Sequence, residues 1–251
     1  MSKNYKKINA AIIIIGNEIL SGRTEEKNIK FISSWLNEKI GITVKEVRII
    51  PDIKHEICKS VLVLSKKFDY VFTTGGIGPT HDDITASSIA SAFKLKYEFN
   101  KKAYNILEKY YGKKNFNDGR KKMAKMPKSS KLILNPSSAA PGFMIRNVFC
   151  LPGVPSILNS MIENCKRYLK RGARTHSKTI NSLTVESNIS KEMSKIQNKY
   201  SKTVEIGSYP FFRLGRVGVS IVLRSQNKHK INLCKKEILK NIVLKKKIKR
   251  V

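Results

Sequence analysis

The first 172 residues alternate short runs of β-branched residues with segments whose apolar positions recur at helical spacing. The apolar run Ile8–Ile15 predicts a buried strand, and residues 42–50 and 69–74 predict two more. Between these strands, apolar residues stand three to four positions apart, as in amphipathic helices that start after one strand and stop before the next. Strands that alternate with helices favour βαβ units, and hence a parallel sheet with helices on both faces.

The same pattern continues beyond the third strand, with less regular spacing. We expect helices at residues 82–92 and near 101–111, strands at residues 132–134 and 144–151, and a helix that begins at Pro155.

A polar, basic stretch at residues 170–178 interrupts the alternation and predicts a domain boundary. We therefore expect one domain at residues 1–172 and a second at residues 173–251. The second is predicted to be a small α+β domain with strands at 179–186, 204–206 and 217–224, a helix at 190–200, and a helix from about residue 231.

Lysine and arginine number 50 against 18 acidic residues, which gives a formal net charge of +32. Such an excess favours an anionic partner. It has an equally good compositional explanation, because Lys, Ile and Asn are abundant and all three are encoded by AT-rich codons. If composition is the cause, nucleic-acid binding is expected to be weak and non-specific, and the run at 245–250 is a solvated end.

The remaining composition predicts a soluble cytoplasmic protein. The four cysteines follow no metal-ligand or disulfide spacing, which is typical of a reducing compartment. No stretch approaches the roughly 18 apolar residues of a membrane span, so no membrane partner is expected.

The segment T-T-G-G-I-G-P-T-H-D-D-I-T at residues 73–85 follows a predicted buried strand. In an open parallel sheet, ligands bind beyond the carboxyl ends of the strands, where this loop is expected to lie. Gly75, Gly76 and Gly78 permit positive φ and a close approach of backbone N–H groups to an anion such as phosphate. The loop matches neither the P-loop nor the dinucleotide-binding glycine motif.

Asp82 and Asp83 come at the end of this loop. One interpretation is that they cap the next helix, because carboxylates are favoured at a helix N-terminus. Beside a phosphate, however, they would repel it unless a cation intervenes. A Mg²⁺-type ion held by one or two carboxylates and by the ligand phosphates would remove that conflict.

The loop, together with G-N-E-I-L-S-G-R at residues 16–23, resembles the molybdopterin-binding (MoaB/Mog-like) domain, most closely that of the CinA family. A tyrosine-containing segment at 206–210 resembles the small middle domain of the same family. Further matching segments are Asn28, residues 51–52, 122–124 with Pro127, Asn135, 140–143 and 151–156.

The resemblance implies a three-layer α/β domain that forms dimers or trimers. In the CinA branch it implies hydrolysis of ADP-ribose-like dinucleotides with Mg, Mn or Co, and FAD is the substrate linked to related domains. As a departure from full-length relatives, this chain is expected to lack their C-terminal deamidase domain. Carried over residue by residue, the resemblance implies that Asp83 and Asp52 are catalytic and that Asp83 and Asp82 bind the metal. The residues that it implies bind the phosphate-bearing ligand are Gly75, Gly76, Gly78, Thr80, Asn17 and Glu18.

Two positions depart from the family pattern. Ser138 stands where glycine is usual, and Ile157 stands where glutamate is common. At Ser138 the approach of the ligand is expected to differ from that in the family. At Ile157, if the family's glutamate helps to bind the metal, this chain has lost that ligand.

Three functions remain open on the sequence. The first is a metal-dependent nucleotide pyrophosphatase, and the second is a protein that binds molybdopterin or another pterin without turnover. The third is a basic protein associated with nucleic acid. The motif G-R-V-G at 215–218 resembles a KH-domain loop, but a hairpin turn is the better interpretation. Tyr209, Phe211 and Phe212 are expected to pack rather than to stack on bases.

Overall fold

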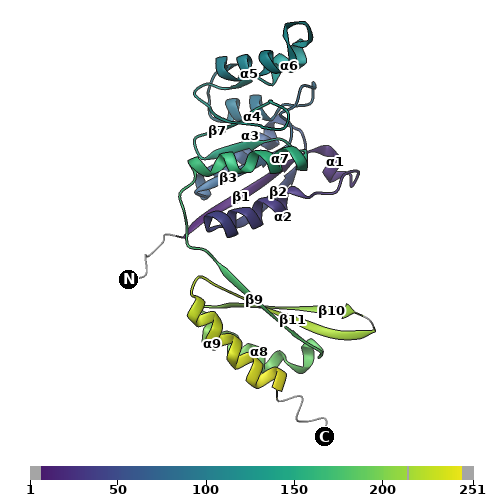
Figure 1. The fold of residues 1–251 in the computed structure, drawn as a ribbon, viewed down its shortest axis with the longest axis vertical. Coiled ribbons are helices and arrows are strands. Elements are labelled where there is room, and N and C mark those ends of the chain that lie inside the picture. The colour runs from purple at the N-terminus through teal and green to yellow at the C-terminus, as the bar shows by residue number, and fades with distance from the viewer. Residues whose placement is uncertain (1–6, 214, 245–251) are drawn as a thin grey trace. The chain divides into compact units, whose positions relative to one another are not determined.

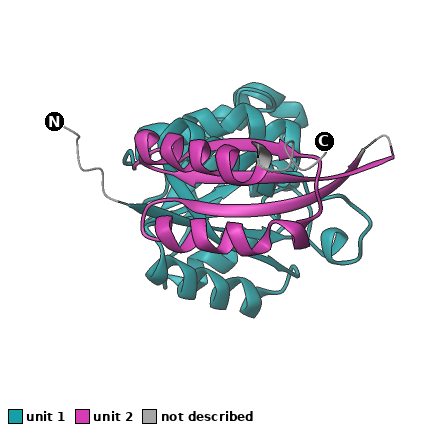
Figure 2. Cartoon of the chain, turned by 90° about the horizontal axis from the view of Figure 1, so that it is seen from below, with its two compact units in different colours: residues 1–172 teal, residues 173–251 magenta. Residues whose placement is uncertain are grey.

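The computed structural model describes residues 7–213 and 215–244 (Figure 1). The chain divides into two compact units, Met1–Gly172 and Ala173–Val251, coloured teal and magenta in Figure 2. The first is an α/β unit and the second a small α+β unit, so the predicted fold class is confirmed. The charge run at residues 245–250 lies outside the described residues.

A six-stranded sheet in the order β2-β1-β3-β8-β7-β6 forms the centre of the first unit. β1 runs parallel to β2 and β3, and β3 runs parallel to β8, whereas β7 is antiparallel to both of its neighbours. The sheet is therefore mostly parallel. Its strands are β1 (Ile8–Ile15), β2 (Ile42–Ile50), β3 (Tyr70–Thr74), β6 (Lys131–Ile133), β7 (Gly142–Ile145) and β8 (Val148–Leu151).

β1 is buried on both faces because helices cover the sheet from both sides (Figure 1). Ile13 belongs to the core under α3 and α4, and Ile12 belongs to the core under α2 and α7. On the second face, Phe72 and Phe149 stack with ring centroids 4.6 Å apart. The covering helices are α2 (Asn28–Trp35), α3 (Lys54–Lys67), α4 (Thr85–Ala92) and α7 (Pro155–Met161), with η1 (Leu36–Ile40) and η3 (Ile162–Tyr168) continuing α2 and α7.

The other elements of the first unit are short. A two-stranded sheet pairs β4 with β5 next to α4. These elements are α1 (Asn17–Leu20), β4 (Tyr97–Phe99), α5 (Lys101–Tyr111), η2 (Lys113–Asn115), α6 (Asp118–Lys122) and β5 (Lys125–Pro127).

Residues 144–151 do not form the single strand that the apolar run predicts. β7 and β8 form an antiparallel hairpin instead, and the chain reverses at Arg146, whose φ is +53°. The Asn147 side chain holds this turn, because its Nδ2 donates to the carbonyls of Ser65 and Phe68 at 2.9 and 3.0 Å. The reversal falls at Arg146 and Asn147, the two polar residues that interrupt this otherwise apolar segment.

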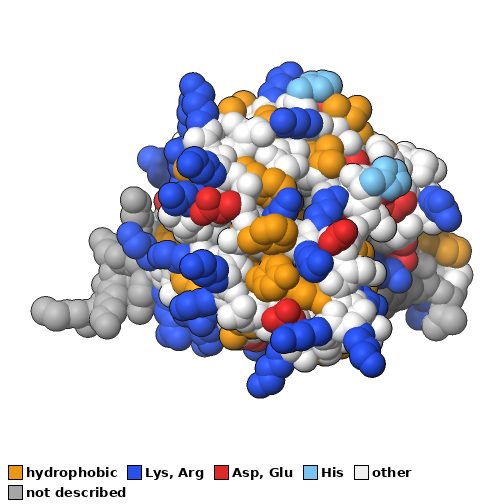
Figure 3. Space-filling view, turned by 90° about the horizontal axis from the view of Figure 1, so that it is seen from above, with side chains coloured by type: hydrophobic (Ala, Val, Ile, Leu, Met, Phe, Trp, Pro, Cys, Tyr) orange, Lys and Arg blue, Asp and Glu red, His pale blue; other side chains and the backbone are white. Residues whose placement is uncertain are grey.

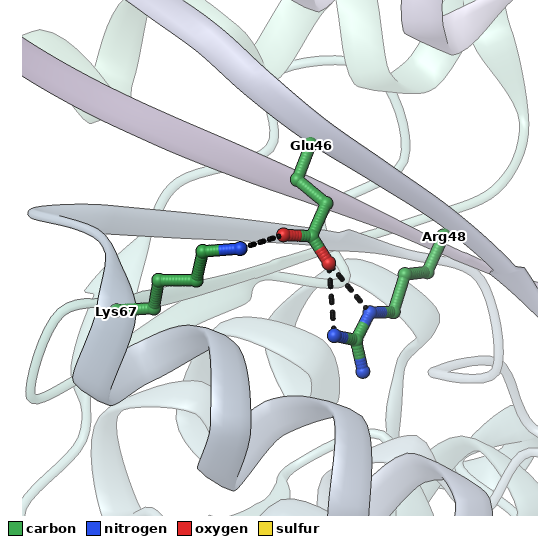
Figure 4. A network of polar contacts seen from close by, with 3 residues as sticks. All are labelled: Glu46, Arg48 and Lys67. Carbon is green, nitrogen blue, oxygen red and sulfur yellow. Dashed lines mark hydrogen bonds and ion pairs between the residues drawn. The ribbon is translucent and has the colours of Figure 1, made fainter.

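Glu46 connects β2 to the end of α3, as Figure 4 shows. Its Oε2 accepts from Lys67 Nζ at 2.7 Å, and its Oε1 accepts from Arg48 Nη2 at 2.8 Å. The hydrogen bond from Lys67, followed by that from Arg48, lowers the pKa of Glu46. The edge strand is thereby joined to the helix that follows it.

The second unit packs two helices on one antiparallel sheet, ordered β10-β11-β9. Residues 215–218 lie at the β10–β11 hairpin, which confirms the hairpin interpretation of G-R-V-G. The expectation that the aromatic rings pack is wrong for Phe212, which is 72% exposed. The Tyr209 and Phe211 rings do pack, over Gly207 and Gly218, although Tyr209 is still 48% exposed. The elements are β9 (His176–Ser182), η4 (Glu186–Asn188), α8 (Ser190–Tyr200), β10 (Glu205–Arg213), β11 (Arg216–Ser225), α9 (Lys228–Ile238) and η5 (Leu239–Leu244).

Across the described ranges, no helix has the length and apolar character needed to cross a membrane.

Candidate functional site

The parallel strands β2, β1, β3 and β8 end at the same edge of the sheet. Each of these strands is followed by a loop that the sequence analysis singled out. The four loops contain residues 16–18, 51–52, 75–85 and 152–154. Segments far apart in the sequence are thus brought together because parallel strands share one carboxyl edge.

Gly75 is where three of these loops approach one another. Its φ is +103°, and a Cβ built on it would lie 2.0 Å from the carbonyl oxygen of Ile15. Its N–H donates to the Leu151 carbonyl at 3.1 Å. On the third side, a Cβ on Gly153 would lie 3.3 Å from Gly75 Cα. Only glycine fits a backbone this close to the ends of β1 and β8.

Gly76 and Gly78 leave space that polar side chains occupy. Gly76 has a φ of +65°, and a Cβ there would lie 2.2 Å from Thr85 Oγ1. A Cβ on Gly78 would lie 2.7 Å from Asp83 Oδ2. The missing side chains therefore let Thr85 and Asp83 stand against the loop backbone.

Asp83 holds the loop closed from within. Its Oδ2 accepts from the Thr80 N–H at 2.8 Å and from the Thr80 hydroxyl at 2.5 Å. The Lys122 ammonium donates to the Thr80 carbonyl. One oxygen of Asp83, Oδ1, is left outside these two bonds.

The helix after the loop begins at Thr85, three residues later than predicted. Ile84 occupies the N-cap position, and no side chain caps the helix. The interpretation of Asp82 and Asp83 as capping residues is therefore wrong. The helix starts later than predicted because the bonds between Thr80 and Asp83 close a turn where its first residues were expected.

Asp52 lies against Gly76 although it follows β2, which is separated from β3 by β1. Its Oδ2 accepts from the Asn17 N–H at 2.9 Å, and a Cβ on Gly76 would lie 3.5 Å from its Oδ1. Burial is the largest influence on this carboxyl and raises its pKa; the Asn17 bond opposes the rise, and the charges of Glu18, Asp82 and Asp83 add to it. The charges of three acidic side chains thus act on the Asp52 carboxyl at this edge.

Several buried polar atoms at this edge have no partner in the part of the chain that the structure describes. They include the hydroxyls of Thr74 and Thr85 and the Oδ1 of Asn28. The amide of Asn28 is oriented by its Nδ2, which donates to the Gly153 carbonyl at 2.7 Å. Because a buried unpaired polar group is costly, these atoms are candidates for contact with a ligand.

Asn17, Glu18, Asp52, Asp82 and Asp83 are therefore brought together, as the resemblance implied. The hydroxyl of Thr80 bonds to Asp83, so the side chain of Thr80 supports the loop.

The sequence assigned no role to Lys122, Lys125, Tyr97 or Thr85. The first three line a small pocket with Asp83, and burial raises the pKa of Tyr97. Lys122 and Thr85 lie in segments that carry the family resemblance, at 122–124 and 73–85. Nothing in the local sequence marks Lys125 or Tyr97, because they reach the pocket from β5 and β4.

The Ser138 departure has a simple structural outcome. The positive φ in that turn, +61°, belongs to Ala139 rather than to Ser138. Ser138 Oγ accepts from Asn135 Nδ2 at 2.8 Å, while Asn135 Oδ1 accepts from the Ser138 N–H at 3.1 Å. Serine therefore fits the backbone here and adds a hydrogen bond.

Within residues 7–213 and 215–244, no group of three or more His, Cys, Asp or Glu side chains is placed to hold a metal ion. A site of the kind expected for Mg²⁺ needs fewer protein ligands, since one or two carboxylates and substrate phosphates suffice.

Comparison with known proteins now identifies the class. The family model described as a probable molybdopterin binding domain matches residues 11–171, and the chain belongs to this family. The model of the middle domain of FAD synthase matches residues 174–250.

Individual relatives extend this result. A protein from Archaeoglobus fulgidus is 35% identical over 79% of this chain and 84% of its own length. A CinA-like protein from Sulfurihydrogenibium is 36% identical over 65% of this chain, which spans 45% of that relative. The crystal structure of a CinA protein of unknown function from Thermoplasma acidophilum matches 64% of this chain and 98% of its own, with 33% identity and a TM-score of 0.61.

The contact of Gly75 with β1 predicts a specific cost of substitution. Gly75→Ala should lower the free energy of unfolding by about 2 kcal/mol or more beyond the loss in Gly22→Ala, because it adds a collision with the Ile15 carbonyl to the positive-φ strain. Gly22 is the matched control, since its φ is +72° and nothing lies within 4 Å of its Cβ position. Urea unfolding measures both, and equal losses would contradict the proposed contact.

Asp52→Asn should raise the thermal midpoint at pH 7. The raised pKa of Asp52 means that its ionised form is disfavoured in the folded state. The gain should disappear as the pH falls toward 3.8, the ordinary pKa, because the wild-type carboxyl is then protonated too. Calorimetry at both pH values measures this difference.

Asp69→Asn is the matched control for this substitution. Asp69 accepts a bond of the same 2.9 Å length from the Asn9 N–H, at the opposite end of the sheet. If Asp52→Asn is the less stable of the two at pH 7, the account of Asp52 is wrong.

Proposed function

We propose that this chain is a divalent-metal-dependent nucleotide pyrophosphatase that acts on ADP-ribose- or FAD-like dinucleotides. The observation that carries the proposal is the gathering of Glu18, Asp52, Asp82 and Asp83 beside a glycine loop. A phosphate-binding site alone would not benefit from four carboxylates, because they repel the ligand. A site that takes a cation together with a phosphate does benefit.

The residues present fit such a cation. Carboxylate oxygens are the ligands that Mg²⁺ and Mn²⁺ prefer, and Asp83 Oδ1 and Asp52 Oδ1 take no part in the bonds that hold their partner oxygens. Asp83 and Asp82 would hold the ion, and Asp52 would face it from β2. When bound, the ion would neutralise phosphate charge and lower the pKa of a water molecule.

The chain's own groups would supply the rest of the chemistry. Backbone N–H groups of residues 75–78 would face the phosphate oxygens, where glycine allows close approach. The hydroxyls of Thr74 and Thr85 are buried donors without a partner among the described residues. Asp52, whose Oδ2 is held by the Asn17 N–H, would accept a proton from the attacking water through its free oxygen.

The family match of the second unit supports a dinucleotide as the substrate. The second unit matches the middle domain of FAD synthase, an enzyme name that refers to a dinucleotide. The first unit matches a probable molybdopterin binding domain, so a pterin phosphate held without turnover is the second candidate. Turnover distinguishes the two functions.

The direct test incubates the protein with ADP-ribose, FAD or NAD and with Mg²⁺, Mn²⁺ or Co²⁺, and follows the release of AMP. We expect release with at least one pair. Asp83→Asn should reduce it by about 100-fold or more, because the bonds from Thr80 can persist while the charge is lost. Asp82→Asn should have a smaller effect.

Asp69→Asn is again the control and should keep wild-type turnover, since Asp69 lies at the other end of β1. No AMP from any pair would favour the pterin-binding function. Full activity in Asp83→Asn would remove Asp83 from the proposed metal site.

A further inference from the structure

A second hollow lies in the first unit, formed by α5, β6 and the end of η3. Its volume is about 660 Å³, a size that accommodates a small ligand. It shares no lining residue with the pocket beside Asp83. The residues of this groove used below are Lys101, Lys102, Lys131, Leu132, Arg167 and Tyr168.

The groove is lined by cations without acids. Lys101, Lys102, Lys131 and Arg167 all line it, and no carboxylate does. In the part of the chain that the structure describes, none of the four forms an ion pair within 4.0 Å. Elsewhere on the same unit, by contrast, Arg48 and Lys67 both form ion pairs with Glu46.

The charge of the chain alone does not explain this arrangement. Figure 3, which looks onto the α5 and α6 end of Figure 1, shows Lys and Arg spread widely over the surface. Dispersed lysines keep their hydration and repel one another little. Four cations that line one groove pay a larger electrostatic cost, which an anion would remove.

Two of these cations share a single aromatic ring. The guanidinium carbon of Arg167 lies 4.8 Å from the centre of the Tyr168 ring, and Lys131 Nζ lies 5.7 Å from it. The ring and the guanidinium are both fixed, because Tyr168 Oη and Arg167 Nη2 donate to the Leu132 carbonyl at 3.1 and 3.0 Å. Arg167 therefore keeps further N–H donors in a defined orientation.

The other two cations occupy an unfavourable place on α5. Lys101 and Lys102 stand in the first turn of this helix, and that turn contains no acidic residue. The helix dipole disfavours cations at that end, so their positions break a local rule. Such exceptions are expected where a ligand compensates for them.

We propose that this groove binds a small ligand with a chain of two or more phosphate groups. The cations come from three separate segments, Lys101–Lys102 on α5, Lys131 on β6 and Arg167 on η3, so a ligand with spread charge fits better than a single phosphate. A polyphosphate chain contacts several cations at once, and Arg167 can hold it through paired donors. This site is separate from the proposed pyrophosphatase site.

The test titrates inorganic tripolyphosphate into the full chain by calorimetry at about 0.15 M ionic strength. We expect one site per chain, with inorganic phosphate at least about tenfold weaker. Lys131→Gln/Arg167→Gln should weaken the binding of tripolyphosphate at least tenfold. Lys59→Gln/Lys66→Gln is the matched control, because it removes the same charge from exposed positions on α3 and should change the affinity less than twofold.

Equal weakening in the two double variants would mean that net charge alone attracts the anion, and would overturn the proposal. So would equal affinity for phosphate and tripolyphosphate, or no binding at all. Because no variant touches Asp52 or Asp83, these outcomes are independent of the AMP-release assay.

Discussion

The contact between Gly75 and the Ile15 carbonyl determines where the groups of the candidate site lie. A Cβ at Gly75 would stand 2.0 Å from that oxygen, so the loop after β3 can cross the end of β1 only as bare backbone. The crossing places Gly76 against Asp52 on one side and against Thr85 on the other. With a side chain at residue 75, the loop would move outward and the acids would separate.

The site that results contains an electrostatic conflict. Burial, and to a smaller extent the charges of Glu18, Asp82 and Asp83, raise the pKa of Asp52, so the fold holds this carboxylate in place at a cost in stability. Proteins retain such costs where function requires them. The groove at α5 and η3 shows the same principle with the opposite sign, because four cations line it without a carboxylate. The first unit thus carries an acidic edge whose carboxylates would be balanced by a cation, and a basic groove whose cations would be balanced by an anion.

The sequence predicted those features that depend on local pattern. Periodicity located the buried strand Ile8–Ile15 and the edge strand Ile42–Ile50, and the glycine loop indicated the edge where the acids gather. The β7–β8 reversal was missed because Asn147 holds it through contacts with a distant helix end. The helix start was misplaced because the bonds from Thr80 to Asp83 compete with the first turn. Lys125 and Tyr97 reach the site only through tertiary packing, which no local pattern encodes.

The central claim is that the acidic edge binds a cation and a pyrophosphate together. The most direct measurement titrates Mg²⁺ by calorimetry, with and without a non-hydrolysable α,β-methylene analogue of ADP-ribose. The account predicts that the analogue tightens Mg²⁺ binding at least about tenfold and that Mg²⁺ tightens analogue binding by the same factor. If the analogue binds and the affinity for Mg²⁺ does not change, the carboxylates and the phosphate do not share an ion and the account is wrong.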